Sequence, residues 1–266
     1  MSSARSDWAY AYGRLEVTVV VIATPLPELA GQLDPGLRPA PQDLTPPGTH
    51  PQVLMFGQHS HVRNWFQSPD AGGHYDEWII ATPFLDWSDG RGRVSSWTTM
   101  TRLYLNSAWF TVLGWLYAYP KKLARMSATP GRYNVRTFPG SSPRVEMQWQ
   151  AAGPAVRWPS FPHAGALSPL FGQPFLQRFG VLPWLGSRMW FGLGASTVQP
   201  ATVQARIHDG CARGFAGRTI ACGSIADGIP GGFRLSCDWM LSRPYLAPSL
   251  PPELRTPMPP DCVSPP

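Results

Sequence analysis

The chain has 266 residues, of which 43% are hydrophobic and only 14% are charged, so it is long enough to bury one sizeable core. Its 22 Lys and Arg against 16 Asp and Glu give a net charge of +6, but the basic residues are spread in ones and twos. A basic stripe or an RNA-binding motif is absent from the sequence, so we expect no nucleic-acid partner, only a mild attraction for anionic small molecules.

The cysteines and the apolar segments indicate the compartment. The four cysteines have no CxxC or zinc-type spacing, so we expect thiols rather than a disulfide framework; they are Cys211, Cys222, Cys237 and Cys262. The longest apolar run, residues 108–119, is too short to span a bilayer. Residues 17–23 are β-branched, which is typical of a strand rather than of a signal peptide. We expect a soluble, cytoplasmic protein with no membrane partner.

The first part of the chain predicts strands separated by turns and Pro-rich loops. Residues 1–14 are polar and are expected to be loosely ordered. A short helix is expected at residues 26–33 and a Pro-rich surface loop at 38–51. A hairpin turn is expected at 89–92. The strands expected here cover residues 15–24, 52–58, 75–83 and 94–105.

Residues 108–116 are uncharged and apolar on every face, which predicts a fully buried helix. Asn106 or Ser107 is the candidate N-cap, and Pro120 ends the segment. Two adjacent lysines, Lys121 and Lys122, follow directly.

An ammonium group is costly to desolvate and two of them repel each other, so at least one amine of this pair should have a lowered pKa. A neutral lysine attacks carbonyl groups and forms a Schiff base, which acts as an electron sink. The alternative is a solvated lysine pair whose charges face the carbonyl end of the helix.

The second part of the chain is again rich in strand patterns. Residues 156–185 are rich in Pro and aromatic residues and form a candidate lid or subunit contact. The tail, residues 244–266, is dense in Pro and is expected to stay outside the core, which leaves one domain at residues 1–243. The expected strands are 133–138 and 144–151, paired as a hairpin, and 189–195, 202–207, 219–223 and 233–241.

The pattern as a whole is mainly β (α+β) and predicts a single antiparallel β-barrel or cone with a few short helices. With the lid and the tail as candidate contacts, we expect a homo-oligomer.

The segment at residues 113–124 (LGWLYAYPKKLA) strongly resembles the signature of the acetoacetate decarboxylase superfamily. Three weaker matches stand in the same order as in that family: residues 26–41, the Tyr75-Asp76-Glu77 strand that ends in Pro83, and the hairpin that follows the lysines. The resemblance covers residues 15–155. It implies a divergent member with a β-cone fold and its reactive lysine inside.

The resemblance assigns roles to particular residues. Lys121 would be the Schiff-base lysine, Lys122 the neighbour that lowers its pKa, and Glu77 the cavity carboxylate that handles protons. Arg14 matches an arginine ahead of the first strand of the family.

The sequence also departs from the family pattern. Trp115 and Leu116 replace an Arg and a Glu that the family usually has before the lysines. Together with Tyr119 they are candidate substrate contacts, and they favour a substrate larger and more apolar than acetoacetate. Residues 55–57 hold no acid where the family has a second cavity glutamate.

The implied function is that of a carbon–carbon lyase of the decarboxylase type, acting on a β-keto acid or a related carbonyl compound. No cofactor is expected, because the protonated imine itself accepts the electrons. The same imine would also serve aldol, dehydration or cyclisation chemistry.

Two alternatives remain open. One is a non-catalytic β-barrel that binds a lipophilic ligand. The other is a metal-dependent enzyme built on His59 and His61, with His74, Asp76 and Glu77 downstream, because a His-x-His on a regular strand puts both rings on one face. The second is disfavoured because no glutamate follows this pair at the spacing seen in cupins, so we expect no metal.

Overall fold

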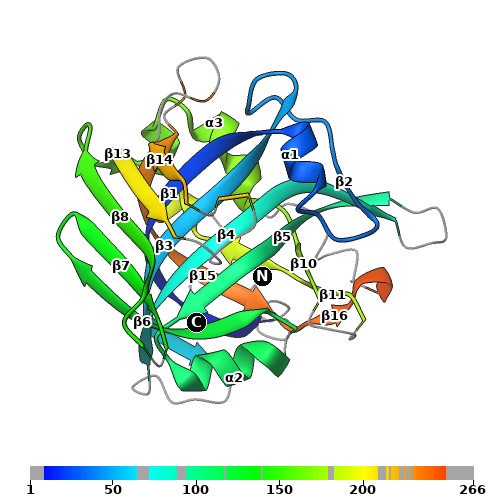
Figure 1. Cartoon of the computed structure of the whole chain (residues 1–266), viewed down its shortest axis with the longest axis horizontal. Coiled ribbons are helices and arrows are strands. Elements are labelled where there is room, and N and C mark those ends of the chain that lie inside the picture. The colour runs from blue at the N-terminus through cyan, green and yellow to red at the C-terminus, as the bar shows by residue number, and fades with distance from the viewer. Residues whose placement is uncertain are drawn as a thin grey trace.

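The computed structural model describes residues 9–64, 72–88, 94–116, 118–138, 140–178, 183–208, 214–215, 217–221, 225, 229 and 231–249. Its framework is a 16-stranded sheet with a few short helices, as Figure 1 shows. The mainly β class expected from the sequence is confirmed.

The strands and helices have the following bounds. The long strands of the sheet are β1 (Ala9–Pro25), β3 (Thr49–Asn64), β4 (Gly73–Ser88), β5 (Val94–Leu105), β6 (Lys121–Thr129), β7 (Arg132–Thr137), β8 (Pro143–Ala151), β13 (Thr197–Ile207) and β15 (Gly232–Ser242). The short strands are β2 (Leu37–Pro39), β9 (Val156–Arg157), β10 (Phe175–Gln177), β11 (Leu185–Ser187), β12 (Met189–Phe191), β14 (Thr219–Ala221) and β16 (Tyr245–Leu246). The helices are α1 (Leu26–Ala30), α2 (Ala108–Leu116), α3 (Ala164–Leu167) and the 3-10 turns η1 (Trp158–Ser160), η2 (Ser168–Phe171), η3 (Leu193–Ala195) and η4 (Ala247–Ser249).

The long strands close into a ring of hydrogen bonds. The path runs β5-β6-β7-β8-β13-β15-β1-β3-β4, and β4 then pairs with β5 again. Neighbouring strands of the ring are antiparallel except for β5 and β6, which are parallel because α2 connects them as a crossover. This one parallel junction is where the lysine pair enters the sheet.

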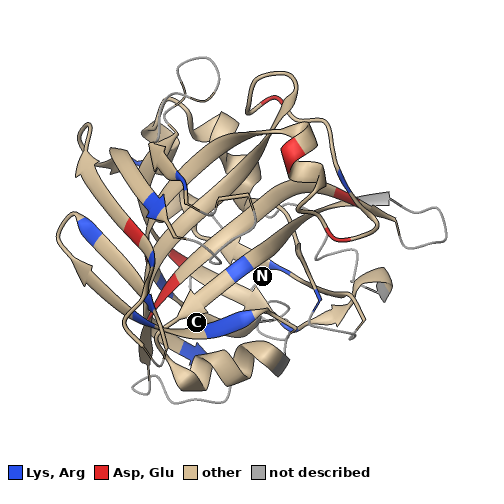
Figure 2. Cartoon of the chain, viewed as in Figure 1, with Lys and Arg blue, Asp and Glu red and all other residues tan. Residues whose placement is uncertain are grey.

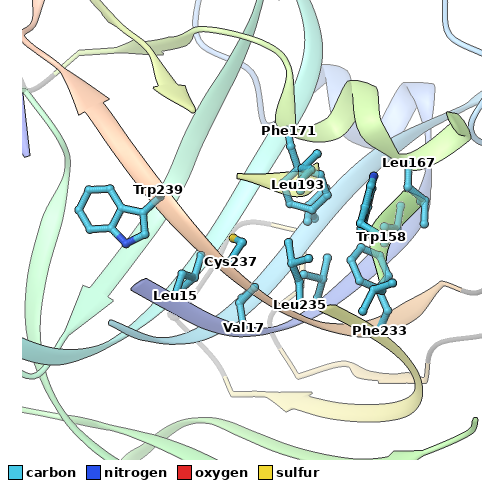
Figure 3. Close-up of a cluster of buried hydrophobic side chains, with 14 of the residues drawn as sticks. Leu15, Val17, Trp158, Leu167, Phe171, Leu193, Phe233, Leu235, Cys237 and Trp239 are labelled. Atoms are coloured by element: carbon cyan, nitrogen blue, oxygen red, sulfur yellow. The ribbon is translucent and has the colours of Figure 1, made fainter. Parts of the chain in front are cut away.

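A buried cluster fills one side of β15 and β1. The alternation expected for residues 233–241 is confirmed: Phe233, Leu235, Cys237 and Trp239 are all buried in it. Figure 3 shows these side chains with their neighbours from β1 and from the segment that carries η1 and α3. Burial raises the pKa of the Cys237 thiol to about 12, so this thiol is an inert core residue. The other three cysteines lie outside the described residues.

Two predictions about the ends of the domain are wrong. The first strand starts at Ala9 rather than at residue 15, because Tyr12 and its neighbours pair with both β15 and β3. The tail does not stay outside the core, since Tyr245 and Leu246 pair with β11 and Ala247 is buried. Residues 250–266 and the predicted turn at 89–92 lie outside the described part.

Helix α2 has the predicted bounds but not the predicted burial. The Oγ of Ser107 accepts a hydrogen bond from the backbone N–H of Phe110 at 3.4 Å, so Ser107 is the N-cap. Trp109, Val112 and Trp115 are 57%, 47% and 43% exposed, respectively. The helix lies against the outside of the ring (Figure 1), so only one of its faces can pack, whatever its composition.

The basic residues show no single stripe. In Figure 2 the ribbon positions of the described Lys and Arg residues are distributed over several strands and are interrupted by acidic positions. Among these residues, the helices are too short or too polar to cross a membrane.

Candidate active site

The site is centred on Lys121, the first residue of β6. Lys121 pairs with Leu103 of β5, which pairs with Ile79 of β4, so these three residues form a row across the sheet. Adjacent residues of a strand face opposite sides. The side chain of Lys121 therefore lies on the same face of the sheet as Leu103 and Ile79, with 13% exposure, while Lys122 points to the opposite face and is exposed.

The Lys121 amine lies near the carboxylate of Glu77, and this carboxylate in turn lies near the ring of His59. Lys121 Nζ lies 3.9 Å from Glu77 Oε2, and the other oxygen of this carboxylate lies 3.4 Å from His59 Nε2. Glu77 and His59 are both buried, on β4 and β3. The result is a buried chain of amine, carboxylate and imidazole.

Burial is the main influence on the pKa of the Lys121 amine. Removal from water lowers the pKa of the Lys121 amine, and the negative charge of Glu77 opposes this without cancelling it. The lowering predicted from the sequence is present in direction, and of its two predicted causes, desolvation and repulsion between the lysines, desolvation is the one that acts. Lys122 is exposed on the other face, and desolvation rather than charge repulsion shifts the pKa.

Glu77 is held as a carboxylate. Burial raises its pKa, but the hydrogen bond from His59 and the positive charges of His59 and Lys121 outweigh burial, so the net pKa is below the ordinary value. An ionised carboxylate within reach of an amine of lowered pKa can accept a proton from the amine or from a bound substrate.

Two tyrosines complete the surroundings of the amine. The rings of Tyr75 and Tyr119 lie 5.7 Å and 5.8 Å from Lys121 Nζ. Tyr119 also shares a hydrogen bond of 2.6 Å with Ser187 of β11. Burial raises the pKa of both phenols above the ordinary value, so both stay neutral and can act as hydrogen-bond donors.

The connection from α2 to β6 positions the lysine through its backbone. The indole N–H of Trp115 donates to the carbonyl of Lys121 at 2.8 Å, and the N–H of Tyr119 donates to the carbonyl of Gly114 at 3.0 Å. Ala118 takes a left-handed conformation, with φ of 58°, to make the turn.

Gly114 leaves room for the lysine side chain. A Cβ atom placed on Gly114 would lie 2.0 Å from Cδ of Lys121 and 2.6 Å from its Cε. The side chain of Lys121 thus runs directly across the face of α2, and residue 114 must lack a side chain for it to do so.

We expect Gly114→Ala to fold but to lower the reactivity of Lys121 toward carbonyl compounds at least tenfold. The methyl group must displace the lysine stem, whereas the change itself favours the helix by about 1 kcal/mol. Gly165→Ala in α3 is the matched control, since nothing lies within 4 Å of its Cβ position. Thermal unfolding and adduct formation, measured on both variants, would contradict this expectation if Gly114→Ala reacted like the wild type.

The structure brings some of the predicted site residues together and leaves others apart. Lys121, Glu77 and Tyr119 meet as expected. Trp115 donates to the backbone carbonyl of Lys121 and is 43% exposed, so we do not count it as a wall of the site.

Arg14 is exposed and donates to Ser236 Oγ at 3.1 Å, because it alternates with the buried Leu15 and so faces the other side of β1. The side chain of Leu116 lies outside the described residues.

The metal alternative fails on local geometry. His61 has a φ of 53° and lies in a register shift between His59 and Val62, so His59 is buried while His61 is exposed. His61 contacts His74 instead, with ring centroids 5.7 Å apart. Within the described part of the chain, no group of three His, Cys, Asp or Glu could hold a metal ion.

Three residues of the site were not foreseen: His59 in its actual role, Tyr75 and Ser187. The His59 ring stacks on Tyr75 with centroids 4.5 Å apart. Tyr75 stands two residues before Glu77 on β4. This period-2 spacing is the signal that could have placed both side chains on the same face of the strand. Ser187 carries no comparable signal.

No protein-family model and no curated protein matches the chain. Solved structures do match, at low identity. The enduracididine biosynthesis enzyme MppR in complex with pyruvate has a TM-score of 0.59 and 16% identity, over 92% of this chain and 93% of that one. Acetoacetate decarboxylase from Legionella pneumophila has a TM-score of 0.58 and 12% identity, over 90% and 87%. An acetoacetate decarboxylase-like enzyme from Sphingomonas wittichii RW1 has a TM-score of 0.54 and 14% identity, over 90% and 92%.

The chain has the acetoacetate decarboxylase-like fold. The resemblance in residues 113–124 thus extends to the whole architecture, including the part after residue 155 for which the sequence offered no specific match. At these identities the likeness concerns the fold, so the chemistry must be argued from the residues around Lys121.

Proposed function

We propose that the protein is a Schiff-base-forming lyase that acts on a β-keto acid or a related carbonyl compound through Lys121. The observation that carries the proposal is the buried Lys121 amine, of lowered pKa, 3.9 Å from the Glu77 carboxylate. An ordinary surface lysine is protonated at neutral pH and does not attack carbonyl groups.

The geometry suits each step of an imine mechanism. The neutral amine of Lys121 adds to the carbonyl carbon, and loss of water leaves a protonated imine. The imine nitrogen takes up the electron pair of the adjacent carbon–carbon bond as carbon dioxide leaves, which gives an enamine. Protonation of the enamine carbon and hydrolysis of the imine release the product and restore the amine.

Glu77 is the proton carrier of this scheme. It is ionised and oriented by His59, so it can take a proton during carbinolamine formation and return one to the enamine carbon. Tyr75 and Tyr119, whose rings lie near the amine and whose phenols stay neutral, would donate hydrogen bonds to the substrate carbonyl oxygen.

The related structures favour carbonyl substrates over an unrelated ligand. MppR has been solved with pyruvate and with the condensation product of pyruvate and imidazole 4-carboxaldehyde. An imine on Lys121 would support either carbon–carbon cleavage or such a condensation, because both pass through the same enamine.

The test is reductive trapping with borohydride. Full-length protein is treated with borohydride and one carbonyl compound at a time: acetoacetate, pyruvate or benzoylacetate. We expect a mass increase equal to the reduced adduct, located on Lys121 by fragmentation of the peptide. Borohydride alone is the control. Absence of any adduct across the three compounds in folded protein would contradict the enzyme proposal and favour a non-catalytic binder.

A further inference from the structure

A pocket lies beside Pro120, at the start of the lysine segment. β5 bonds to β10 only at Thr98 and to β6 only from Leu103 onward, so the sheet is open between these points. A pocket of about 250 Å³ fills this opening and is covered by the segment that follows α1. Neither Glu77, His59 nor Tyr75 lines it, so it is separate from the site around Lys121.

The polar lining of this pocket presents an unused hydrogen-bond donor. Gln177, at the end of β10, is only 3% exposed, and its side-chain Nε2 has no hydrogen-bond partner among the described residues. Gln32 also lines the pocket, but its Nε2 is packed against Gly214 and its Oε1 accepts from Gln52 Nε2 at 3.2 Å. A buried donor left unpaired is costly, so a ligand that accepts a hydrogen bond from the Gln177 amide would recover this free energy.

The charged residues of the lining also favour an anionic ligand. Arg102 and Arg178 contribute two guanidinium groups, against one carboxylate from Asp34. Arg178 also lies over the Trp184 ring, 5.7 Å from its centroid. Two cations and the amide donor of Gln177 around one space match an anion that accepts several hydrogen bonds.

Part of the lining is apolar, and this favours an anion that carries an apolar group. Leu37, Leu176 and Trp184 form one wall, which a bare inorganic ion could not use. A planar carboxylate pairs well with guanidinium, and a short apolar body would cover this wall.

We propose that this pocket binds a small carboxylate with an apolar body, independently of the chemistry at Lys121. The proposal does not depend on the proposed function, because the ligand needs no carbonyl group. Pro120 lines the pocket and directly precedes Lys121, so an occupant would touch the segment that holds the reactive lysine.

The test is calorimetric titration of the full-length protein with benzoate, which cannot form an imine. We expect saturable binding of benzoate, with benzamide and inorganic phosphate at least tenfold weaker. Arg178→Gln, an exposed position that should not affect folding, and Gln177→Leu should each weaken benzoate binding about tenfold, since each removes a hydrogen bond to a charged group. Asp34→Asn should tighten it, because it removes the one negative charge.

Arg125→Gln is the matched control, an exposed cation that lies over the Phe138 ring, away from the pocket. It should leave benzoate binding unchanged. The proposal is overturned by the absence of saturable binding, by benzamide or phosphate binding as tightly as benzoate, or by Arg125→Gln weakening binding as much as Arg178→Gln.

Discussion

Lys121→Ala will abolish both borohydride trapping and turnover, while Lys122→Ala will leave both nearly at the wild-type level. The two lysines are neighbours in sequence but face opposite sides of β6, and only Lys121 is buried beside Glu77. A covalent mechanism has no substitute for its nucleophile, so the loss should be complete to the limit of detection. Among the described residues, no hydrogen bond or ion pair joins the Lys122 side chain to Lys121 or Glu77.

The measurement is adduct mass and product formation for both variants, after circular dichroism has shown that both are folded. Removing the buried amine of Lys121 leaves Glu77 with His59 as its partner, so we expect Lys121→Ala to fold. Equal losses in the two variants would contradict the assignment. So would a pH profile of trapping that moved to higher pH in Lys122→Ala, since this would make charge repulsion the cause of the lowered pKa.

Glu77→Gln should separate imine formation from proton transfer. The carboxylate of Glu77 favours the protonated amine, so its removal lowers the pKa of Lys121 further. The acid limb of the trapping rate should therefore move to lower pH. Turnover should fall about 10²–10⁴-fold, because the group that returns a proton to the enamine carbon is gone.

Asp76→Asn is the matched control for Glu77→Gln. It removes the same charge from the adjacent residue of β4, but Asp76 is half-buried, bonds to Asn106 at 3.0 Å and faces away from Lys121. We expect no change in the acid limb and no loss of turnover. If Glu77→Gln moved the acid limb to higher pH, or kept full turnover, Glu77 would not be the proton carrier.

The reactive lysine could be predicted from the sequence because its evidence is local. The bounds of α2, the break at Pro120 and the position of the lysine pair all lie within fifteen residues and depend on helix signals. Glu77 followed from the order of motifs along the chain. Both residues could be named without knowledge of how the strands pair.

The remaining site residues depend on pairing and could not be predicted in this way. A His-x-His pair places His59 and His61 on one face only where the strand alternates regularly. The register shift before Val62 breaks this alternation, so the pattern mispredicts the position of His59. The sequence predicts a buried Trp115 because its segment is apolar on every face. Apolar composition alone does not say whether a helix packs against partners on one side or on all sides. Arg14 was placed by likeness to a family position, and the alternation of β1 turned it outward.

The pairing of β1 has a consequence for the order in which the protein can fold. β1 is hydrogen-bonded on one side to β3 and on the other to β15, which ends at Ser242. During synthesis the early strands can form a meander, but the second edge of β1 stays unpaired until almost the whole chain has left the ribosome. A nascent chain that stalls before residue 232 therefore exposes a strand edge with an apolar run of valines. We expect such truncated chains to aggregate or to be held by chaperones. They should fold only after residues 232–242 have been synthesised and β15 can pair with β1.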